Sequence, residues 1–429
     1  MRRFFRAGLR GALCRYARAR PSAGGAGDGQ VSILLLSAWG TAGTVRAALN
    51  LADYFARTRS VEILSVFRRM DEPFFHFPPG VKVSALDDWR PGATPRGVRL
   101  LRNILRRHPS VLMHPADRAS SEFNLWVDVM FAHRLRRRSG FLIGTESGLN
   151  LIAAKLSPPG MLTIGEEQTH LPMHPRPLRR SMRRHYRRLD TIVGPTESHL
   201  RSFEPLLSRR DGSGPVRSSI PHPVWAGGGR GADLSAQTVL AAGTIMREKG
   251  FDLLIKAYAQ VAKRHPDWRL RICGAGDLTD KLRIWIMGRG LADVIEFPGP
   301  RDMEDEMSAA SIFVLSSRSE SFPLALLEAM SKGMAVVSFD CPTGPGDILD
   351  DHRNGILVPP KHIDGLAQAI CELIENEDLR RACAAAAVET AREYTIEAIG
   401  RRWDALFDEL ARARRTAPLS PSALHPSGR

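Results

Sequence analysis

Apolar runs of strand length alternate along most of the chain with longer segments of helical periodicity. Residues 31–37 (VSILLLS) form one such run, and residues 45–56 repeat apolar side chains at helical spacing. The alternation continues to about residue 208. Because strands separated by helices usually pair in parallel, the pattern predicts an open parallel sheet with helices on both faces.

The same alternation restarts after a segment, residues 209–236, that is rich in Gly, Ser and Pro and is typical of a linker. A strand is predicted at 238–244 and a helix at 251–264. The apolar face of that helix comprises Phe251, Leu254, Ile255, Tyr258, Val261 and Ala262. The chain is thus expected to hold two α/β halves. Because open parallel sheets bind ligands at the carboxyl ends of their strands, we expect function in a cleft between the halves.

The expected division of the chain follows these composition changes. In order it has a basic N-terminal tail (1–30), a Rossmann-like domain (31–208), a linker (209–236), a second Rossmann-like domain (237–395), a helix crossing back to the first domain (396–412) and a tail (413–429).

Composition narrows the class of protein. The 429 residues are 43% hydrophobic and 25% charged, which excludes a disordered, collagen-like or disulfide-stapled chain. The net charge of +15 favours anionic partners such as nucleotides or anionic lipid. Aromatic residues, at 7%, are not interleaved with the basic ones, so nucleic-acid binding is not expected.

Two further absences in the sequence bear on its location. The five cysteines are scattered, as expected in a reducing compartment, and no apolar run reaches the ~20 residues that span a bilayer. We expect a cytoplasmic protein, with peripheral attachment to the inner membrane face left open. Residues 1–20 carry no acid, which fits an amphipathic segment on anionic lipid, a transit peptide or an unstructured tail.

The most specific chemical signal lies in residues 316–345, where seven residues separate Glu320 from Glu328. We expect Ser321 to cap a helix that has Pro323 in its first turn, which leaves the N–H groups of Phe322 and Leu324 free. Free amides at a helix start are an anion site suited to a diphosphate. Two carboxylates at this separation can accept hydrogen bonds from hydroxyls on two parts of one ligand.

Residues 241–257 supply a matching cation. Lys249-Gly250 follows a short loop after a predicted strand and opens a helix. A lysine in that position can hold a phosphate, although an ordinary strand–turn–helix would also explain it.

With these motifs the chain resembles the family-four retaining glycosyltransferases, which have the GT-B fold of two Rossmann-like domains facing across a cleft. The resemblance implies that Glu320 contacts the hydroxyls of a donor sugar and that Glu328 binds the ribose of the nucleotide. It implies that Lys249 holds the donor diphosphate as it leaves. The family has an Arg where this chain has Thr244, and Arg247 is the candidate substitute.

The resemblance adds further candidates. It implies donor contacts at Gly43, Thr44, Thr244, Gly274, Pro298, Ser321, Phe322, Pro323 and Leu324. It also implies a histidine near the donor sugar, for which His170 is the first candidate and His174 the second. The Arg run between Arg176 and Arg188 is either a solvated helix face or a surface for anionic lipid or a phosphorylated acceptor.

We therefore expect a retaining transferase that moves a hexose or N-acetylhexosamine from a nucleotide-diphosphate sugar, UDP-linked by preference, to a glycan, lipid-linked or cell-envelope acceptor. No cofactor is expected beyond the donor itself. No Asp-x-Asp occurs at a strand end, so no metal is expected at the diphosphate. One alternative is a non-catalytic nucleotide-sugar-binding subunit, given Thr244, and another is a sugar-nucleotide epimerase of the same fold.

Overall fold

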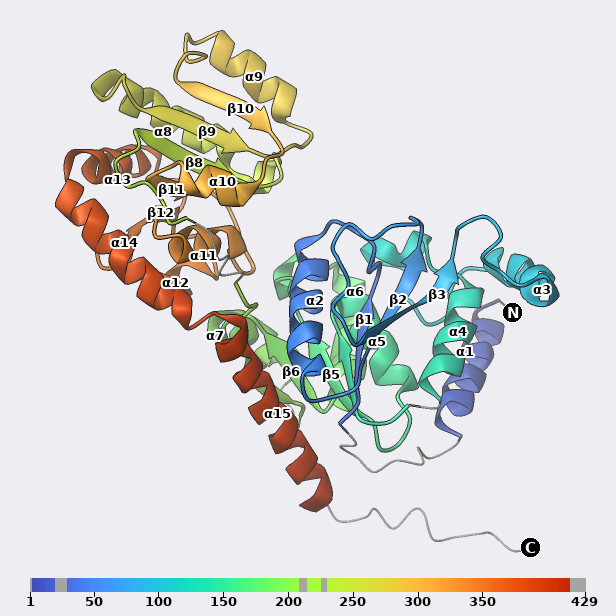
Figure 1. Ribbon diagram of the computed structural model, residues 1–429. Helices are drawn as coiled ribbons and strands as arrows, with labels where there is room; N and C mark the ends of the chain where they lie inside the picture. The colour runs from blue at the N-terminus through green and yellow to red at the C-terminus, as the bar shows by residue number, and fades with distance from the viewer. Residues whose placement is uncertain (1, 20–28, 137, 208–213, 225–229, 417–429) are drawn as a thin grey trace, which may run out of the picture. The chain divides into compact units, whose positions relative to one another are not determined.

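Two sheets organise the chain in the computed structural model, which describes residues 2–19, 29–136, 138–207, 214–224 and 230–416 (Figure 1). Unit 1 comprises Met1–Val193, Phe203–Ser218 and Gly400–Arg429, and unit 2 comprises Gly194–Ser202 and Ser219–Ile399. Parts of the expected linker (209–213 and 225–229) and of the expected tail (417–429) lie outside the described residues.

Unit 1 is built on a seven-stranded sheet with the order β3-β2-β1-β4-β5-β6-β7. Its strands are β1 (Val31–Leu35), β2 (Val61–Arg68), β3 (Val81–Asp88), β4 (Phe141–Gly144), β5 (Leu162–Glu166), β6 (Thr191–Gly194) and β7 (Val216–Ser219). The pairs from β3 through β6 are parallel. The chain order reverses between β1 and β4, and the loops that leave these two strands therefore diverge at one point of the sheet edge.

Helix α1 (Arg2–Arg18) precedes the first strand of unit 1, and the other helices of this unit follow strands in the chain. These are α2 (Gly43–Ala56), α3 (Arg96–Arg106), α4 (Leu125–Leu135), α5 (Ser147–Leu156), α6 (Arg176–His185) and α15 (Ile396–Thr416), with α7 (Glu197–Leu207) divided between the units. Short 3₁₀ turns are η1 (Arg118–Ser121), η2 (Leu171–Met173) and η3 (Tyr186–Arg188).

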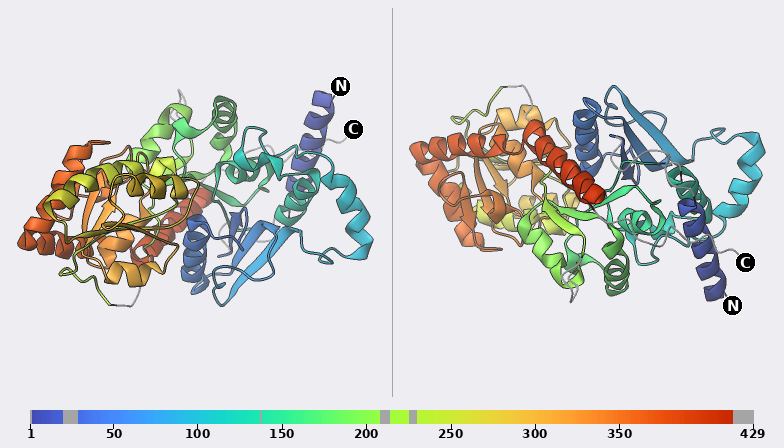
Figure 2. Two further views of the ribbon diagram at one scale, coloured as in Figure 1. Left: turned by 90° about the horizontal axis from the view of Figure 1, so that it is seen from above. Right: turned by 90° about the horizontal axis from the view of Figure 1, so that it is seen from below.

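The start of the chain differs from the expected basic tail. Residues Arg2–Arg18 form helix α1, which packs along α4 and α5 (Figures 1 and 2). Leu13 and Ala17 are buried in the core on that side of the unit 1 sheet, and Leu9 packs against it. Because the segment is rich in arginine, its few apolar residues are not conspicuous in the sequence. They lie on one side of the helix and pack it against the unit 1 core.

From Gly400 on, helix α15 belongs to unit 1, although its first residues (396–399) and the chain before them belong to unit 2. Its Trp403 and Phe407 are buried and contact the ring of Phe55 of α2 edge-on and tilted, at ring-centroid distances of 6.0 Å and 5.2 Å. Asp404 accepts hydrogen bonds from the hydroxyl of Tyr54 and from the guanidinium of Arg59.

Unit 2 is built on a six-stranded sheet with the order β10-β9-β8-β11-β12-β13, and all its pairs are parallel. Its strands are β8 (Thr238–Ala242), β9 (Arg269–Cys273), β10 (Ile295–Gly299), β11 (Ile312–Leu315), β12 (Ala335–Phe339) and β13 (Ile356–Val358). The chain order reverses between β8 and β11, which is where a sheet of this kind binds ligands.

Helices cover both faces of the unit 2 sheet (Figure 1). They are α8 (Phe251–Arg264), α9 (Thr279–Met287), α10 (Met303–Ser308), α11 (Leu324–Ser331), α12 (Pro345–Ile348), α13 (Ile363–Glu375) and α14 (Glu377–Arg392), with the 3₁₀ turn η4 (Arg247–Lys249). Successive strand residues alternate between the faces: Ile312 and Val314 pack with α8 and α13, whereas Phe313 and Leu315 pack with α11 and α14.

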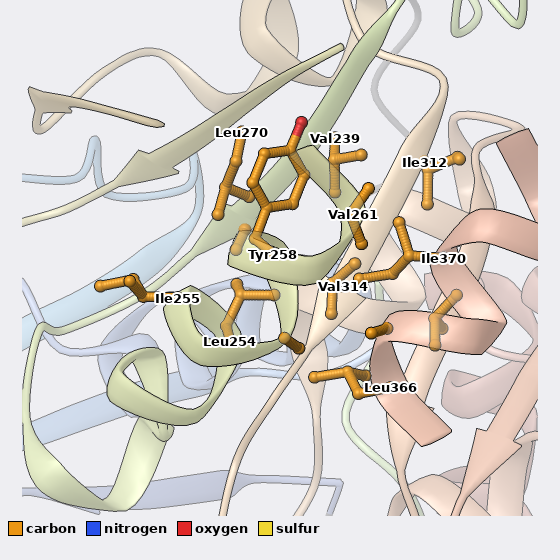
Figure 3. Packing of buried hydrophobic residues seen from close by; sticks show 14 of the residues in the cluster. Val239, Leu254, Ile255, Tyr258, Val261, Leu270, Ile312, Val314, Leu366 and Ile370 are labelled. Atoms are coloured by element: carbon orange, nitrogen blue, oxygen red, sulfur yellow. The ribbon is translucent and has the colours of Figure 1, made fainter. Parts of the chain in front are cut away.

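The predicted apolar face of α8 is the one that the structure buries. Leu254, Tyr258 and Val261 lie against strand residues such as Val239 and against Ile370 of α13 (Figure 3). These observations confirm the predicted α/β class with two parallel, doubly wound sheets.

Candidate functional site

The predicted lysine and the first predicted glutamate meet at the switch point of unit 2. Lys249 Nζ lies 2.6 Å from Glu320 Oε1, and the two residues come from the loops that follow β8 and β11. The same carboxylate oxygen accepts a hydrogen bond of 2.5 Å from Ser317 Oγ. Glu320 is buried and Lys249 is partly exposed, so the ammonium group is accessible to solvent whereas its carboxylate partner is not.

Two glycines let the loops of unit 2 approach each other closely enough to form this pair. Gly250 has a φ of 69°, and a Cβ there would lie 2.0 Å from the carbonyl oxygen of Ser316. Gly274 has a φ of 136°, and a Cβ there would lie 2.0 Å from the carbonyl oxygen of Gly243. Only glycine tolerates both the backbone conformation and the contact.

Arg318 and Asp252 brace the lysine loop, and sequence reasoning missed both. The guanidinium of Arg318 donates two hydrogen bonds to the Asp252 carboxylate, at 2.8 Å and 2.7 Å, and a third of 2.6 Å to the carbonyl of Arg247. The hydrogen bonds from Arg318 hold the pKa of Asp252 below its usual range. A bidentate Arg–carboxylate pair fixes geometry as well as charge, so it positions the turn that carries Lys249. The pairing of Asp252 with an arginine 66 residues away leaves no local signal in the sequence.

The helix expected to start at Ser321 starts later. Helix α11 begins at Leu324 with Pro323 as its N-cap, and no side chain caps it. The N–H of Leu324 donates to the carbonyl of Phe322 at 3.0 Å, so it is not the free amide that was predicted. The residue before a proline avoids the helical conformation, which prevents Phe322 from serving as the first helical residue.

The residues around this turn divide into packing and site roles. Phe322 is buried and its ring lies 6.0 Å from His222 and 5.9 Å from Tyr394, so its side chain packs in the interior of unit 2. Pro323 is buried as well, while Ser321 and Leu324 are partly exposed. Glu328 lies partly exposed in α11, one turn beyond the start of the helix.

The remaining unit 2 candidates lie on the same edge of the sheet. Thr244 lies in the loop after β8 and Arg247 is the first residue of η4, and both are exposed. Gly274 follows β9, and Pro298 lies at the end of β10 where the register shifts. All four are therefore carried by loops or strand ends at the carboxyl edge.

The unit 1 candidates gather at its own switch point. Gly43 and Thr44 are the first two residues of α2, rather than part of the preceding loop. Thr44 lines a cavity of about 260 Å³ together with Glu146 and Ser147, which follow β4. His174, the second histidine candidate, lines it too and its Nε2 lies 3.3 Å from Ser147 Oγ, whereas His170 is not among the residues that line it.

This cavity is acidic, a feature that sequence reasoning missed. Burial, and then the charges of Asp117 and Glu167, raise the pKa of Glu146 to about 7. Behind it, Glu167 accepts hydrogen bonds from Ser147 Oγ at 2.8 Å and from the Tyr186 hydroxyl. Carboxylates with raised pKa values in a cavity are typical of ligand sites.

Comparison with known proteins shows which family and which solved structures the chain is similar to. Residues 230–390 match the family model of glycosyl transferases group 1. An exopolysaccharide phosphotransferase of Streptomyces coelicolor is 33% identical over 406 residues, which cover 90% of this chain and 42% of that protein. The chain thus spans about two fifths of that relative, and it spans half or less of the next curated relatives.

Solved structures share the fold across both units. A mutant of S. aureus TarM, in complex with Fondaparinux, alpha-GlcNAc-glycerol and UDP, matches with a TM-score of 0.68 at 13% identity over 88% of this chain and 99% of that one. The pneumococcal O-GlcNAc transferase GtfA, in complex with UDP and GlcNAc, matches with a TM-score of 0.67 at 15% identity over 89% of this chain and 99% of that one. The fold is therefore GT-B, and unit 2 carries a glycosyl transferases group 1 domain, as the motifs predict.

None of the described helices is both long enough and apolar enough to cross a bilayer.

Proposed function

We propose that this chain transfers a hexose or N-acetylhexosamine from a UDP-linked donor to a glycan, lipid-linked or cell-envelope acceptor. The observation that carries the proposal is the Lys249–Glu320 pair at the β8/β11 switch point. Lys249 supplies a cation for the diphosphate, and Glu320 accepts hydrogen bonds from donor-sugar hydroxyls. Glu328 holds the ribose. The acidic cavity of unit 1 supplies the acceptor side.

The reaction we propose retains configuration at the anomeric carbon. The bond from that carbon to the phosphate oxygen breaks while the acceptor oxygen bonds to the same face. The acceptor proton passes to the leaving phosphate, and Lys249 offsets the negative charge that develops there. The existing pairing of Glu320 with Lys249 and Ser317 supports an orienting role for this glutamate over that of a nucleophile.

Variants of the pair test the proposal. Lys249→Ala should lower turnover by about 100-fold or more, because one preorganised charge is commonly worth that much. Lys263→Ala, an exposed lysine on α8, is the matched control and should leave turnover unchanged. Lys249→Ala also removes the cation that pairs with the buried Glu320 carboxylate. If this leaves the single variant unfolded, the Lys249→Ala/Glu320→Gln double variant removes the unpaired charge as well, and its turnover is measured instead.

The assay is UDP release from UDP-sugars, with NMR of the product to read the anomeric configuration and a chelator to test the proposed independence from metal. Glu328→Ala should weaken UDP affinity about tenfold in calorimetry, through loss of a charged hydrogen bond. Turnover of Lys249→Ala equal to that of Lys263→Ala would rule out the assigned site. If UDP binds but no UDP-sugar tested releases UDP, the alternative holds: a nucleotide-sugar-binding subunit with Thr244 in place of the Arg.

We also propose that the protein acts in the cytoplasm, attached peripherally to the anionic inner face of a membrane through α3. The inward side of this helix carries both Arg102, which is buried, and Leu105, which packs against the core of unit 1. Arg102 is only 8% exposed and pairs with Asp87 at 2.7 Å, whereas Leu100, Leu101 and Ile104 are 73%, 51% and 46% exposed. The stretch 89–116 contains no acid. A basic helix with an outward apolar face suits an anionic lipid surface.

A further inference from the structure

A second cavity of unit 1 lies apart from the acidic one and has the opposite charge. Its volume is about 250 Å³. Its walls come from helix α1, from residues 111–115, from α5 and from α6. None of the described residues that line it carries a carboxylate.

A buried lysine forms the floor of this basic cavity. Lys155 of α5 is 5% exposed, and its Nζ donates one hydrogen bond of 2.7 Å to the carbonyl of Leu112. Burial, and then the charge of Arg10, lower its pKa to about 8. The neighbouring acid, Asp128, directs its oxygens to Ser110 Oγ at 2.6 Å and to the N–H of Val111 at 2.6 Å. No ion pair joins it to Lys155 among the described residues.

Helix α1 adds two guanidinium groups. Arg6 and Arg10 line the cavity, and Arg6 is held by a hydrogen bond of 2.7 Å to the carbonyl of Ser110. His114 lines it as well, and burial followed by the charge of Lys155 lowers the pKa of that histidine. Arg6 and Arg10 are exposed at the cavity, whereas Lys155 is buried, and a buried cation is costly unless a counter-charge joins it.

His185 of α6 does not line the cavity but lies in the positive potential of the same cations. Burial, and then the charges of Lys155, Arg188, Arg184 and Arg10, lower the pKa of His185 to about 4. Its Nδ1 is buried and has no hydrogen-bond partner in the described structure. Cationic groups of α1 and α5 therefore converge on one small space, with no acid among the described residues that line it.

We propose that this cavity binds a phosphoryl group, held by Arg6, Arg10 and Lys155. Guanidinium groups pair with phosphate oxygens through two parallel N–H donors, and the buried lysine gains the counter-ion that it lacks. The phosphoryl group belongs either to a lipid headgroup or to a free phosphate or phosphate ester. The site is independent of the proposed donor site, which lies in unit 2.

Calorimetry with inorganic phosphate tests this site in a Lys249→Ala background, so that phosphate bound at the donor site does not contribute. Arg10→Ala should weaken phosphate affinity about tenfold, through loss of a charge-assisted hydrogen bond. Arg15→Ala removes the same charge from an exposed position of the same helix, outside the cavity, and should change affinity less than twofold. Lys155→Met should abolish binding, and Arg10→Ala decides the matter if that variant does not fold.

Heat evolved without phosphate-dependent saturation, or equal weakening by Arg10→Ala and Arg15→Ala, would overturn the proposal. Sedimentation with phosphatidic acid vesicles, compared with phosphatidylcholine vesicles, then separates the two sources. Phosphatidic-acid-dependent sedimentation that Arg10→Ala reduces and Arg15→Ala does not assigns the site to a lipid phosphate. Phosphate binding that depends on Arg10, combined with sedimentation that does not, assigns it to a soluble phosphate or phosphate ester.

Discussion

At the scale of single residues, the chain reveals the chemistry of its candidate site better than the supports of that site. Lys249 and Glu320 could each be singled out from sequence because each follows a predicted strand, and the structure brings them to 2.6 Å. Their roles stay predictions. Arg318 and Asp252 could not be found, since a bidentate ion pair between distant loops depends on tertiary structure alone.

Gly250 allows a clean test of that local geometry. Gly250→Ala should destabilise unit 2 by more than the ~1–2 kcal/mol of left-handed strain, because the new Cβ would also meet the carbonyl of Ser316 at 2.0 Å. Gly290→Ala is the matched control: its φ is 65°, but nothing lies within 4 Å of the added Cβ. Urea denaturation of each variant gives the free energy of unfolding. Equal losses for the two variants would show that the contact with Ser316 costs nothing.

At the scale of elements, periodicity predicted the strands and the main helices, and it failed where charge and apolar residues are mixed. From the sequence, the segment that forms α1 was predicted to be a basic tail. Its arginines outnumber Leu13 and Ala17, which are the side chains that it buries among those described. The start of α11 was also predicted too early. The prediction placed Pro323 in the first turn but did not consider that the residue before a proline, here Phe322, avoids the helical conformation.

Helix α3 shows most clearly what periodicity cannot decide. Its residues separate into an arginine side and an apolar side, and a pattern of this kind ordinarily predicts that the apolar side faces the core. Here the buried Asp87 draws Arg102 inward, and Arg106 lies over the ring of Trp89 at 4.8 Å. Arg102 and Leu105, one from each side, both turn inward, and the pairing of Arg102 with a buried carboxylate of β3 is a contact that the periodicity of α3 does not contain.

The outward face of α3 makes a prediction about vesicle binding. Leu100→Ser should reduce binding to phosphatidylglycerol vesicles about tenfold, since one inserted leucine side chain is worth ~1.5–3 kcal/mol. Thermal stability should not change, because this side chain is exposed. Ile284→Ser is the control, at a position of α9 that is 71% exposed, and it should bind vesicles as the parent does. Parent-like binding by Leu100→Ser, or dimers in sedimentation velocity that the variant dissolves, would instead assign the face to a protein contact.

At the scale of the whole molecule, the chain builds unit 1, then unit 2, and returns to unit 1 with α15. The two parallel sheets were predictable from the alternation of strands and helices, and the strand order follows from the usual winding of such sheets. The composition of the unit 1 core was not, because Phe407 meets Phe55 and Phe141 from a helix more than 260 residues further along the chain.

Because α15 completes the core of unit 1, we predict that a core substitution in α15 lowers the stability of unit 1, although most of unit 1 precedes unit 2 in the chain. Phe407 is fully buried, with ring-centroid distances of 5.2 Å to Phe55 and 4.3 Å to Phe141. Phe407→Ala should therefore cost unit 1 about 3–5 kcal/mol, the usual range for an aromatic residue removed from a core. Arg402→Ala, on the exposed side of the same helix, should cost neither unit anything measurable.

Native-state hydrogen exchange reads the two units separately in one experiment. In Phe407→Ala, amides of β1 and β4 should lose protection, while those of β8 and β11 keep theirs and UDP binding persists. If β8 and β11 lost protection equally, the units would unfold as one, and α15 would stabilise the whole chain rather than the core it completes. The predicted outcome also implies that unit 1 reaches full stability only after unit 2 has been synthesised, because its last core residues follow unit 2 in the sequence.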